Sequence, residues 1–203
     1  MNISKQHWEQ VFETKSPKEV SWTQKYPTIS MELIQSFKLS KSSSIIDVGG
    51  GDSLLVDALL EKGYTNITVL DISEKALLRA QARLGERAKK INWIVSDINV
   101  FKPHKNYDLW HDRASFHFLT QKKDIINYKE IVNAYVSTAL VIGTFSREGP
   151  ERCSGLPITQ YSCASMEENF REKFISEECR VEDHITPFET KQNFTFSRFV
   201  KKQ

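Results

Sequence analysis

Residues 45–53, which read IIDVGGGDS, decide how this chain folds. An apolar run ends in an acid and three glycines, and a leucine-rich segment with helical spacing follows from Leu54. Glycines at a strand-to-helix turn let the backbone approach a ligand without a clash at Cβ. The free amides at a helix start face that ligand with a partial positive charge. The stretch therefore predicts a β-strand, a ligand-binding turn and a helix, in that order.

A second acid, Asp71, closes the next apolar run at 67–70. It lies twenty residues beyond Gly51, where a βαβ unit places a carboxylate for ribose hydroxyls. A dinucleotide fingerprint would require a third glycine at the position of Leu54, and no phosphate-binding G-x-x-x-x-G-K-[ST] pattern occurs. The two acids and the turn therefore indicate a nucleoside-containing cofactor that is not a dinucleotide.

The acid before the glycines carries a family resemblance. Asp47, Gly49 and Gly51, spaced D-x-G-x-G, resemble the first motif of the class I, seven-stranded S-adenosylmethionine (SAM) methyltransferases. A carboxylate at the strand tip suits the cationic part of SAM, and helix-start amides suit its carboxylate. The resemblance extends from about residue 45 to 200, with Ser53 where the family often has another glycine. It implies SAM as the cofactor.

The resemblance also implies a role for acids at two further strand ends. Asp71, with Ile72 beside it, matches the family's acid that accepts from both ribose hydroxyls. Asp97 and Ile98 follow the strand-like run 91–95 and match the family's adenine contact. These four residues complete the expected cofactor site.

Strand-like and helix-like segments alternate from residue 44 onward, which predicts a parallel sheet with crossover helices. Two later strand-like runs, near 178–186 and 192–200, are joined by a turn too short for a crossover helix, so they should pair antiparallel. The resemblance implies the same α/β fold: a doubly wound, mostly parallel seven-stranded sheet with helices on both faces and a C-terminal antiparallel hairpin. The other strands are expected near 44–48, 66–71, 91–95, 106–111 and 139–145, and helices near 53–62, 74–88, 122–138 and 165–174.

At 203 residues the chain is expected to form a single methyltransferase domain, 1–203. Residues 1–43 would form an N-terminal helix and lid segment, and 44–203 a Rossmann-like core. Trp22 in the lid would stack near the SAM sulfonium, because cations favour aromatic faces. The alternative is that Trp8 and Trp22 only pin this segment to the core.

Composition argues against several classes of protein. The net charge is +2 with no long basic block, which argues against a dedicated nucleic-acid binder. No run approaches eighteen apolar residues and the first residues are polar, so we expect no membrane span and a cytoplasmic location. Three sparse cysteines without C-x-x-C spacing predict reduced thiols and no metal site. Nothing in the sequence indicates an oligomeric state.

Catalytic candidates lie at and just after the end of the run 107–112, which matches the family's fourth strand and its reaction centre. Methyl transfer is an in-line displacement that needs a nucleophile about 3 Å from the methyl carbon. An acceptor that carries a proton also needs a base, and His111 and His117 are the natural candidates, because the histidine side chain ordinarily titrates near neutral pH. Asp112 would orient a substrate amine or pair with Arg113. The alternative is that Asp112 and Arg113 form a structural ion pair while the histidines fill polar niches.

The acceptor is expected to contact Arg113 and the loop after the fifth strand, which supplies Arg147, Arg152 and Cys153. Cys153, flanked by arginine, would be a soft ligand or thiolate for a metalloid or thiol acceptor, or simply a small buried residue. The amino-methylating nucleic-acid enzymes of the family use an Asn-Pro-Pro-Tyr type of motif that is absent here, which disfavours methylation of DNA or RNA bases.

The leading hypothesis is a SAM-dependent methyltransferase that acts on a small molecule. From the compact length of 203 residues we expect no appended recognition domain. One alternative is a protein lysine methyltransferase. Another is a SAM-binding protein without catalysis.

Overall fold

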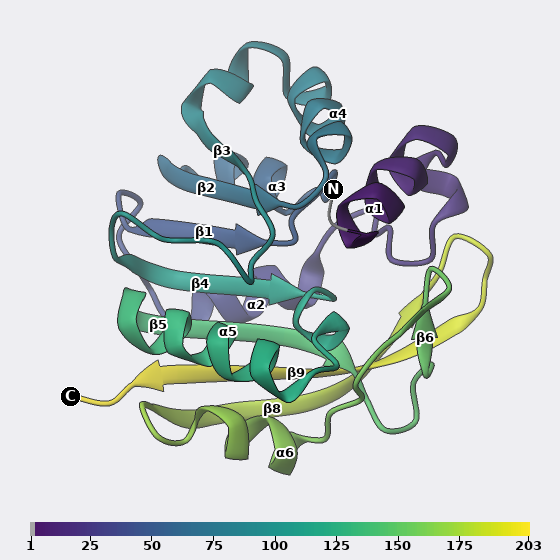
Figure 1. The fold of residues 1–203 in the computed structure, drawn as a ribbon. Helices are drawn as coiled ribbons and strands as arrows, with labels where there is room; N and C mark the ends of the chain where they lie inside the picture. Colours follow the sequence, from purple (N-terminus) through teal and green to yellow (C-terminus); the bar gives the residue numbers. More distant parts are fainter. Residues whose placement is uncertain (1–2) are drawn as a thin grey trace.

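A computed structural model describes residues 3–203 and contains a seven-stranded sheet in the order β3-β2-β1-β4-β5-β9-β8 (Figure 1). The first five strands of that order are parallel, and β9 runs antiparallel to both of its neighbours. The strands are β1 (Ser44–Val48), β2 (Asn66–Asp71), β3 (Ile91–Val95), β4 (Tyr107–Arg113), β5 (Val136–Phe145), β8 (Phe174–Ile185) and β9 (Lys191–Lys201). The predicted α/β fold with a C-terminal antiparallel hairpin is confirmed.

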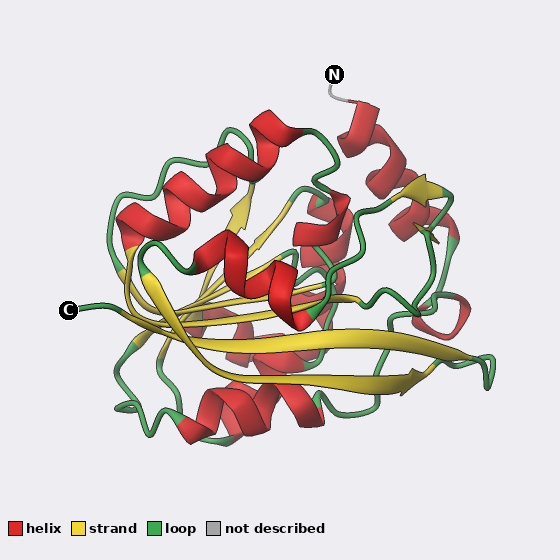
Figure 2. Cartoon of the chain, turned by 90° about the horizontal axis from the view of Figure 1, so that it is seen from below, coloured by secondary structure: helices red, strands yellow, loops and turns green. Residues whose placement is uncertain are grey.

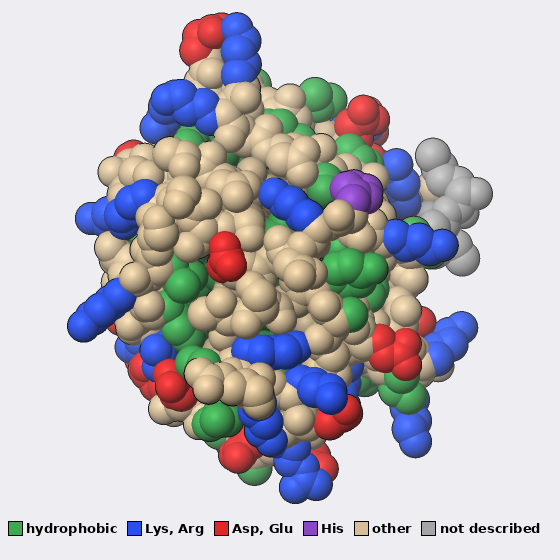
Figure 3. All heavy atoms as spheres, turned by 90° about the vertical axis from the view of Figure 1, so that its left-hand side faces the viewer, with side chains coloured by type: hydrophobic (Ala, Val, Ile, Leu, Met, Phe, Trp, Pro, Cys, Tyr) green, Lys and Arg blue, Asp and Glu red, His purple; other side chains and the backbone are tan. Residues whose placement is uncertain are grey.

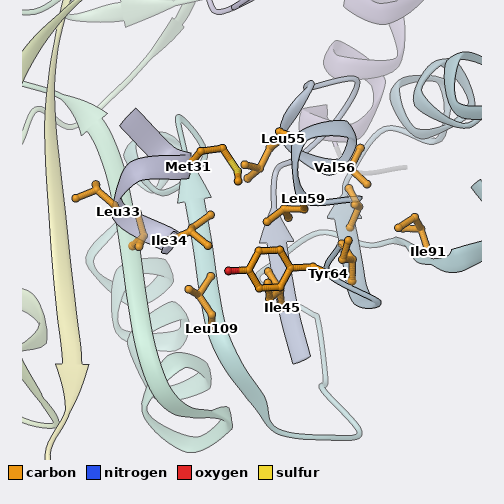
Figure 4. Packing of buried hydrophobic residues seen from close by; sticks show 14 of the residues in the cluster. Met31, Leu33, Ile34, Ile45, Leu55, Val56, Leu59, Tyr64, Ile91 and Leu109 are labelled. Atoms are coloured by element: carbon orange, nitrogen blue, oxygen red, sulfur yellow. The ribbon is translucent and has the colours of Figure 1, made fainter. Parts of the chain in front are cut away.

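Helices cover both faces of the sheet, which is seen edge-on in Figure 2. Side chains of α2, α3 and α4 pack on one face, and those of α5 and α6 on the other. The close-up in Figure 4 shows α2 and α3 side chains against Ile45 of β1 and Leu109 of β4. The helices are α1 (Ile3–Thr14), α2 (Thr28–Ser36), α3 (Leu55–Glu61), α4 (Glu74–Leu84), α5 (Lys122–Tyr135) and α6 (Cys163–Phe170), with 3-10 turns at Pro17–Glu19, Gly85–Lys90 and Phe116–Phe118.

The strand order reverses between β1 and β4, because β1 leads to β2 on one side and pairs with β4 on the other. In open α/β sheets, ligands bind beyond the carboxyl ends of the strands at such a switch point. Figure 1 shows α1 lying beyond these ends, beside the β1–β4 junction. The topology therefore places the N-terminal segment (residues 3–36, containing α1 and α2) next to the expected ligand site.

The sheet and most crossover helices lie where the sequence predicts them, within a few residues. Ser73 is the N-cap of α4, since its hydroxyl accepts from the Ala76 amide at 3.2 Å. Helix α2 was not predicted, and the turn-rich stretch after β5 contains a small hairpin of β6 (Arg152–Cys153) and β7 (Leu156–Pro157).

The prediction of three reduced thiols is wrong. Cys163 at the start of α6 and Cys179 in β8 form a disulfide, with Cα atoms 5.7 Å apart. The sheet brings the two segments together, because α6 leads directly into β8 and packs against it. Cys153 is a free, buried thiol.

The composition led us to expect no membrane span and no basic face for nucleic acid, and both expectations concern the outer surface. Within residues 3–203, no helix is both long and apolar enough to cross a membrane. On the face shown in Figure 3, basic and acidic side chains are interspersed rather than segregated. That face therefore has no continuous basic track for a phosphate backbone.

Candidate active site

A cavity of about 540 Å³ lies at the carboxyl ends of β1, β2 and β4, within the range of about 300–1,000 Å³ typical of small-molecule sites. One wall comes from the core: the glycine turn, the ends of the strands and the loop after β4. The opposite wall comes from the N-terminal segment, through Trp8, Phe12 and Trp22 among others. The cavity thus lies at the switch point of the sheet, between β1 and β4.

The glycine turn depends on backbone conformations that favour glycine. Gly49 and Gly51 have φ values of +65° and +49°. A Cβ on Gly50 would lie 2.6 Å from a carboxylate oxygen of Asp47, and one on Gly49 would lie 2.5 Å from Cβ of Ser115. The turn is held against β2, because the Gly49 amide donates to the Leu70 carbonyl at 2.8 Å. These contacts explain why three glycines occur together.

Asp71, the residue predicted to bind the ribose, is buried at the end of β2 and lines the cavity. Its carboxylate accepts from the Ser73 amide at 2.8 Å. Burial raises the pKa of Asp71 to about 7, and nearby Asp47 and Asp52 add to this rise, while amides of Ser73 and Gly51 oppose it. The protein therefore holds a carboxyl here that ionises near neutral pH.

The other predicted cofactor residues also reach the cavity. Ile72, Asp97 and Ile98 line it together with Asp47, Gly49, Gly51 and Trp22. Asp97 accepts from the Asn99 amide at 2.9 Å, which orders the loop after β3. The acids that follow β1, β2 and β3 thus meet around one side of the cavity.

His111 sits in a buried hydrogen-bonded chain between Asp47 and Ser30. Its Nδ1 is 2.7 Å from Asp47 Oδ1, and its Nε2 is 2.9 Å from Ser30 Oγ. Because a carboxylate only accepts, Nδ1 carries a ring proton, and in the neutral imidazole Nε2 accepts from the Ser30 hydroxyl. All three residues line the cavity and are almost completely buried. Ser30 comes from α2 and was not predicted as a site residue.

The other two catalytic candidates lie away from the cavity lining. Asp112 points to the opposite face of β4, where it accepts from the Ser115 and Phe116 amides and from the Tyr128 hydroxyl. Burial raises the pKa of Asp112 to about 6. His117 is fully buried, and burial followed by the charge of Arg113 lowers its pKa to about 3. Asp112 and His117 are thus both buried in the core, and neither joins His111 in the lining of the cavity.

The predicted acceptor residues divide in the same way. Arg113 and Cys153 line the cavity. Burial raises the pKa of the Cys153 thiol to about 11, partly opposed by Arg113, so the thiolate form is disfavoured. Arg147 and Arg152 are exposed and are not among the lining residues, and Arg152 instead donates to the Gly155 carbonyl.

The N-terminal segment is fastened over the site by polar and aromatic contacts. Glu9 of α1 accepts from the Ser73 hydroxyl at 2.9 Å and from the Glu74 and Lys75 amides at 2.8 and 3.1 Å. It thereby satisfies free amides at the start of α4, where a carboxylate is favoured. Trp8 packs edge-on against Phe118 and Trp22, with ring centroids 5.1 and 5.8 Å apart.

Sequence reasoning missed Ser30 and Glu9. Both belong to the N-terminal segment, and both act on partners more than sixty residues away in the chain. The signal available for Glu9 was a polar residue within the expected N-terminal helix, whereas no helix was predicted around Ser30. That signal does not distinguish a solvated position from a buried contact.

A family model described as a methyltransferase domain matches residues 45–135. Malonyl-[acyl-carrier protein] O-methyltransferase 2 of Ilyobacter polytropus is 30% identical over 86 residues, which cover 42% of this chain and 33% of that protein. EEF1A lysine methyltransferase 2 of Danio rerio is 29% identical over 85 residues, which cover 41% of this chain and 36% of that protein. The matched region thus spans about a third of the length of these curated relatives.

Solved structures match nearly the whole chain at low identity. A SAM-dependent methyltransferase from Anabaena variabilis has a TM-score of 0.76 at 12% identity, over 100% of this chain and 96% of that one. The N-methyltransferase NodS from Bradyrhizobium japonicum, solved with S-adenosyl-L-homocysteine (SAH), has a TM-score of 0.70 at 16% identity over the full length of both. At these identities the likeness concerns the fold.

Proposed function

We propose, since this chain belongs to the class I SAM-dependent methyltransferases, that it transfers a methyl group from SAM to a small-molecule acceptor. The observation that carries the proposal is the cavity at the switch point, in which acids from three strand ends line one side. The N-terminal segment forms the opposite wall. A cavity of this volume between two walls suits a small acceptor better than an extended polymer.

The residues fit SAM. Asp71, which ends β2, would hold the ribose hydroxyls, and Asp97, after β3, would meet the adenine. Asp47 and the turn at 49–51 would bind the methionyl end through a carboxylate and backbone amides. An acidic lining matches the positive charges of SAM, and a cavity of about 540 Å³ has room for a ligand of that size.

When bound, SAM supplies an electrophilic methyl group on a sulfonium. The chain would hold the acceptor atom in line with that methyl and take up the proton the acceptor loses. Ser30 Oγ would accept this proton while passing its own to His111 Nε2. Asp47, at 2.7 Å from Nδ1, would stabilise the imidazolium that results. His111 is thus proposed to act as a base through Ser30.

The aromatic side chains of the N-terminal segment would exclude water from this reaction. Trp8, Phe12 and Trp22 line the cavity and contact one another. We assign Trp22 to the neighbourhood of the sulfonium, since an aromatic face attracts a cation. Closure would also strengthen the electrostatic contacts inside the site, because it lowers the local dielectric constant.

A protein lysine acceptor is the second candidate, because one of the relatives is a lysine methyltransferase. The acceptor side of this cavity argues against it. Its lining residue Arg113 is a cation that would repel a lysine ammonium. The small-molecule proposal is therefore preferred.

A labelled-methyl assay tests these functions. Purified protein would be incubated with SAM carrying a radioactive methyl group and with a cell extract divided into small molecules, proteins and nucleic acids. We expect label in the small-molecule fraction. Label in protein alone would support the lysine alternative, and SAM binding without any product would support a non-catalytic role.

A further inference from the structure

We propose that the acceptor carries a carboxylate or a similar oxyanion, and that Arg113 binds it through Nε and Nη2. This inference rests on the methyltransferase function proposed above and names the chemical class of its substrate. The same chemistry is present in SAM, which has a carboxylate of its own. The experiments below therefore separate these two sources.

The hydrogen bonds of Arg113 leave one complete side of its guanidinium unused. Nη1 donates to the Trp22 carbonyl at 3.0 Å. Nε and Nη2 are shielded from solvent and have no partner. These two nitrogens direct their N–H bonds to the same side of the guanidinium. Two parallel donors match the two oxygens of a carboxylate or of a phosphate.

No carboxylate within residues 3–203 forms an ion pair with Arg113. The ring of Phe194 lies 4.7 Å from its Cζ, which covers the guanidinium face but offers no acceptor oxygen. Burial lowers the pKa of Arg113 to about 10, although the group stays charged at neutral pH. The charge of Asp47 also acts on Arg113, although the two groups form no ion pair. A charge shielded from water without a paired counter-ion is costly, so a ligand that brings one would be bound strongly here.

Charge is distributed unevenly around the cavity. Acidic side chains follow β1, β2 and β3, on the side assigned to SAM: Asp47, Asp52, Asp71 and Asp97. The other lining arginine, Arg83, is engaged with Asp57 at 2.7 Å and with backbone carbonyls. Arg113 stands at the end of β4 beside β5, where its charge helps to lower the pKa of His117 and of His184 after the effect of burial. Asp124 at the start of α5 lines the cavity as well. The positive charge is therefore local to Arg113, on the β5 side of the site, where it favours an anion.

Access to this region passes by the N-terminal segment. Two consecutive carbonyls of that segment, Ser21 and Trp22, accept from His184 Nε2 at 2.7 Å and from Arg113 Nη1. The segment has no helix or strand at these residues. Because Nε and Nη2 are shielded, we expect an anion to reach them when this short stretch moves outward.

The Nε–H signal of Arg113 gives a direct measurement. Protein labelled with nitrogen-15 and loaded with SAH would be titrated with acetate, with inorganic phosphate and with acetamide, the neutral analogue of acetate. The signal is identified by its absence in Arg113→Lys. We expect saturable shifts with acetate or phosphate, and at least about tenfold weaker binding of acetamide, since charge-assisted hydrogen bonds are lost.

Variants of Arg113 test whether its paired donors, Nε and Nη2, cause the preference for acetate over acetamide. Arg113→Met should abolish the preference for acetate over acetamide, measured by calorimetry on the SAH-loaded protein. Arg113→Lys keeps the charge without the paired donors and should bind acetate with intermediate affinity. Arg171→Met is the control, because that arginine follows the last residue of α6, is 66% exposed and pairs with Glu168 at the surface. It should bind acetate as the wild type does.

Three results would overturn the inference. The first is no saturable shift with either anion, and the second is equal binding of acetamide. The third is a shift of the Arg113 signal on SAH addition together with loss of acetate binding. That result would mean that Nε and Nη2 of Arg113 bind the carboxylate of the cofactor. Failure of the methyltransferase function itself would show differently, as absence of SAH binding or of labelled product while the anion still shifts the signal.

Enzyme turnover offers a second check. The small-molecule extract that supports methylation would be passed over an anion-exchange resin, and the acceptor should be retained. Arg113→Lys should raise KM for the retained acceptor more than it changes KM for SAM. An acceptor that flows through the resin would contradict an anionic substrate.

Discussion

Asp71 shows how burial of a single carboxyl can make cofactor binding depend on pH. The ionised form accepts from ribose hydroxyls, whereas burial raises its pKa to about 7. Binding of SAM should therefore release a proton at lower pH. Affinity should rise by up to about tenfold per pH unit below 7 and level off above it. Calorimetry in buffers of different ionisation enthalpy would measure both effects.

The ligand-free protein should show the opposite trend in stability. Because the folded pKa of Asp71 lies above the unfolded value of 3.8, the folded state binds more protons between these values. Its contribution to the free energy of unfolding therefore decreases as pH rises from about 4 to 7. Asp71→Asn should make both the SAM affinity and the free energy of unfolding depend less on pH. It should also weaken SAM binding about tenfold or more. Unchanged affinity in that variant would place the ribose elsewhere.

Ser30→Ala tests the proposed proton path from the acceptor through Ser30 to His111. The variant keeps the His111–Asp47 contact but removes the hydroxyl 2.9 Å from His111 Nε2. We expect kcat to fall by about 100-fold, since general base catalysis contributes about 10²–10⁴-fold. SAH affinity, measured by calorimetry, should change little.

Ser36→Ala is the matched control for that experiment. Ser36 lies in the same helix, but its hydroxyl is exposed and donates to the Leu33 carbonyl. It should retain wild-type kcat. A wild-type kcat in Ser30→Ala would remove Ser30 from the reaction.

For single residues, the sequence predicted which residue types meet on the side of the cavity assigned to SAM, because acids at successive parallel strand ends must converge. It did not separate the faces of β4. His111 and Arg113 reach the cavity, whereas Asp112 between them faces the other way. Alternation along a strand contains that information, but only once the strand is known to extend to Arg113.

Helix α1 is the element whose attachment is most open to experiment. Glu9→Gln removes the charge that caps α4, and we expect a loss of about 0.5–2 kcal/mol in unfolding free energy. Cleavage by trypsin in residues 15–25 should accelerate, and SAH should bind more weakly because one wall of the cavity is loosened. Limited proteolysis with and without SAH would measure this.

Glu13→Gln is the control on the same helix. Glu13 pairs with Lys75 at 2.7 Å, but its side chain is 63% exposed, and such surface pairs contribute little. Its cleavage rate should stay close to that of the wild type. Equal rates for the two variants would show that Glu9 does not fasten the helix.

Elements with a single clear period were predicted well, and α2 shows why others were not. Ile29, Met31 and Leu33 alternate as they would in a strand, although Ile34 continues a helical face. Short apolar segments fit both periods, and tertiary packing against α3 and β4 decides between them.

The disulfide bears on the stability of the whole molecule. A bridge that closes a loop of about 16 residues contributes about 3 kcal/mol in the chain-entropy description. A reducing agent should therefore lower the melting temperature. Thiol titration of the native protein should detect at most the single cysteine Cys153, and all three after reduction and unfolding.

Cysteine variants test whether the reducing agent lowers the melting temperature by breaking the disulfide or by some other action on the protein. The double variant Cys163→Ser, Cys179→Ser should melt at the same temperature with or without the reductant. Cys153→Ser should keep the difference between the two conditions. Three reactive thiols in the native protein would contradict the bridge.

The overall architecture was predictable because alternating strands and helices, with a final short turn, admit few topologies. The disulfide was not, since sixteen residues separate its cysteines and no spacing rule joins them. Only the packing of α6 on β8 brings them within reach.

Ser73 has a further consequence for the molecule. Its amide donates to Asp71 and its hydroxyl to Glu9, so one residue joins the ribose site to α1. If docking of α1 and occupancy by SAM favour each other, linkage requires that they do so by the same factor. A binding protein selected to recognise α1 in its docked position would therefore raise the affinity for SAM without touching the cavity.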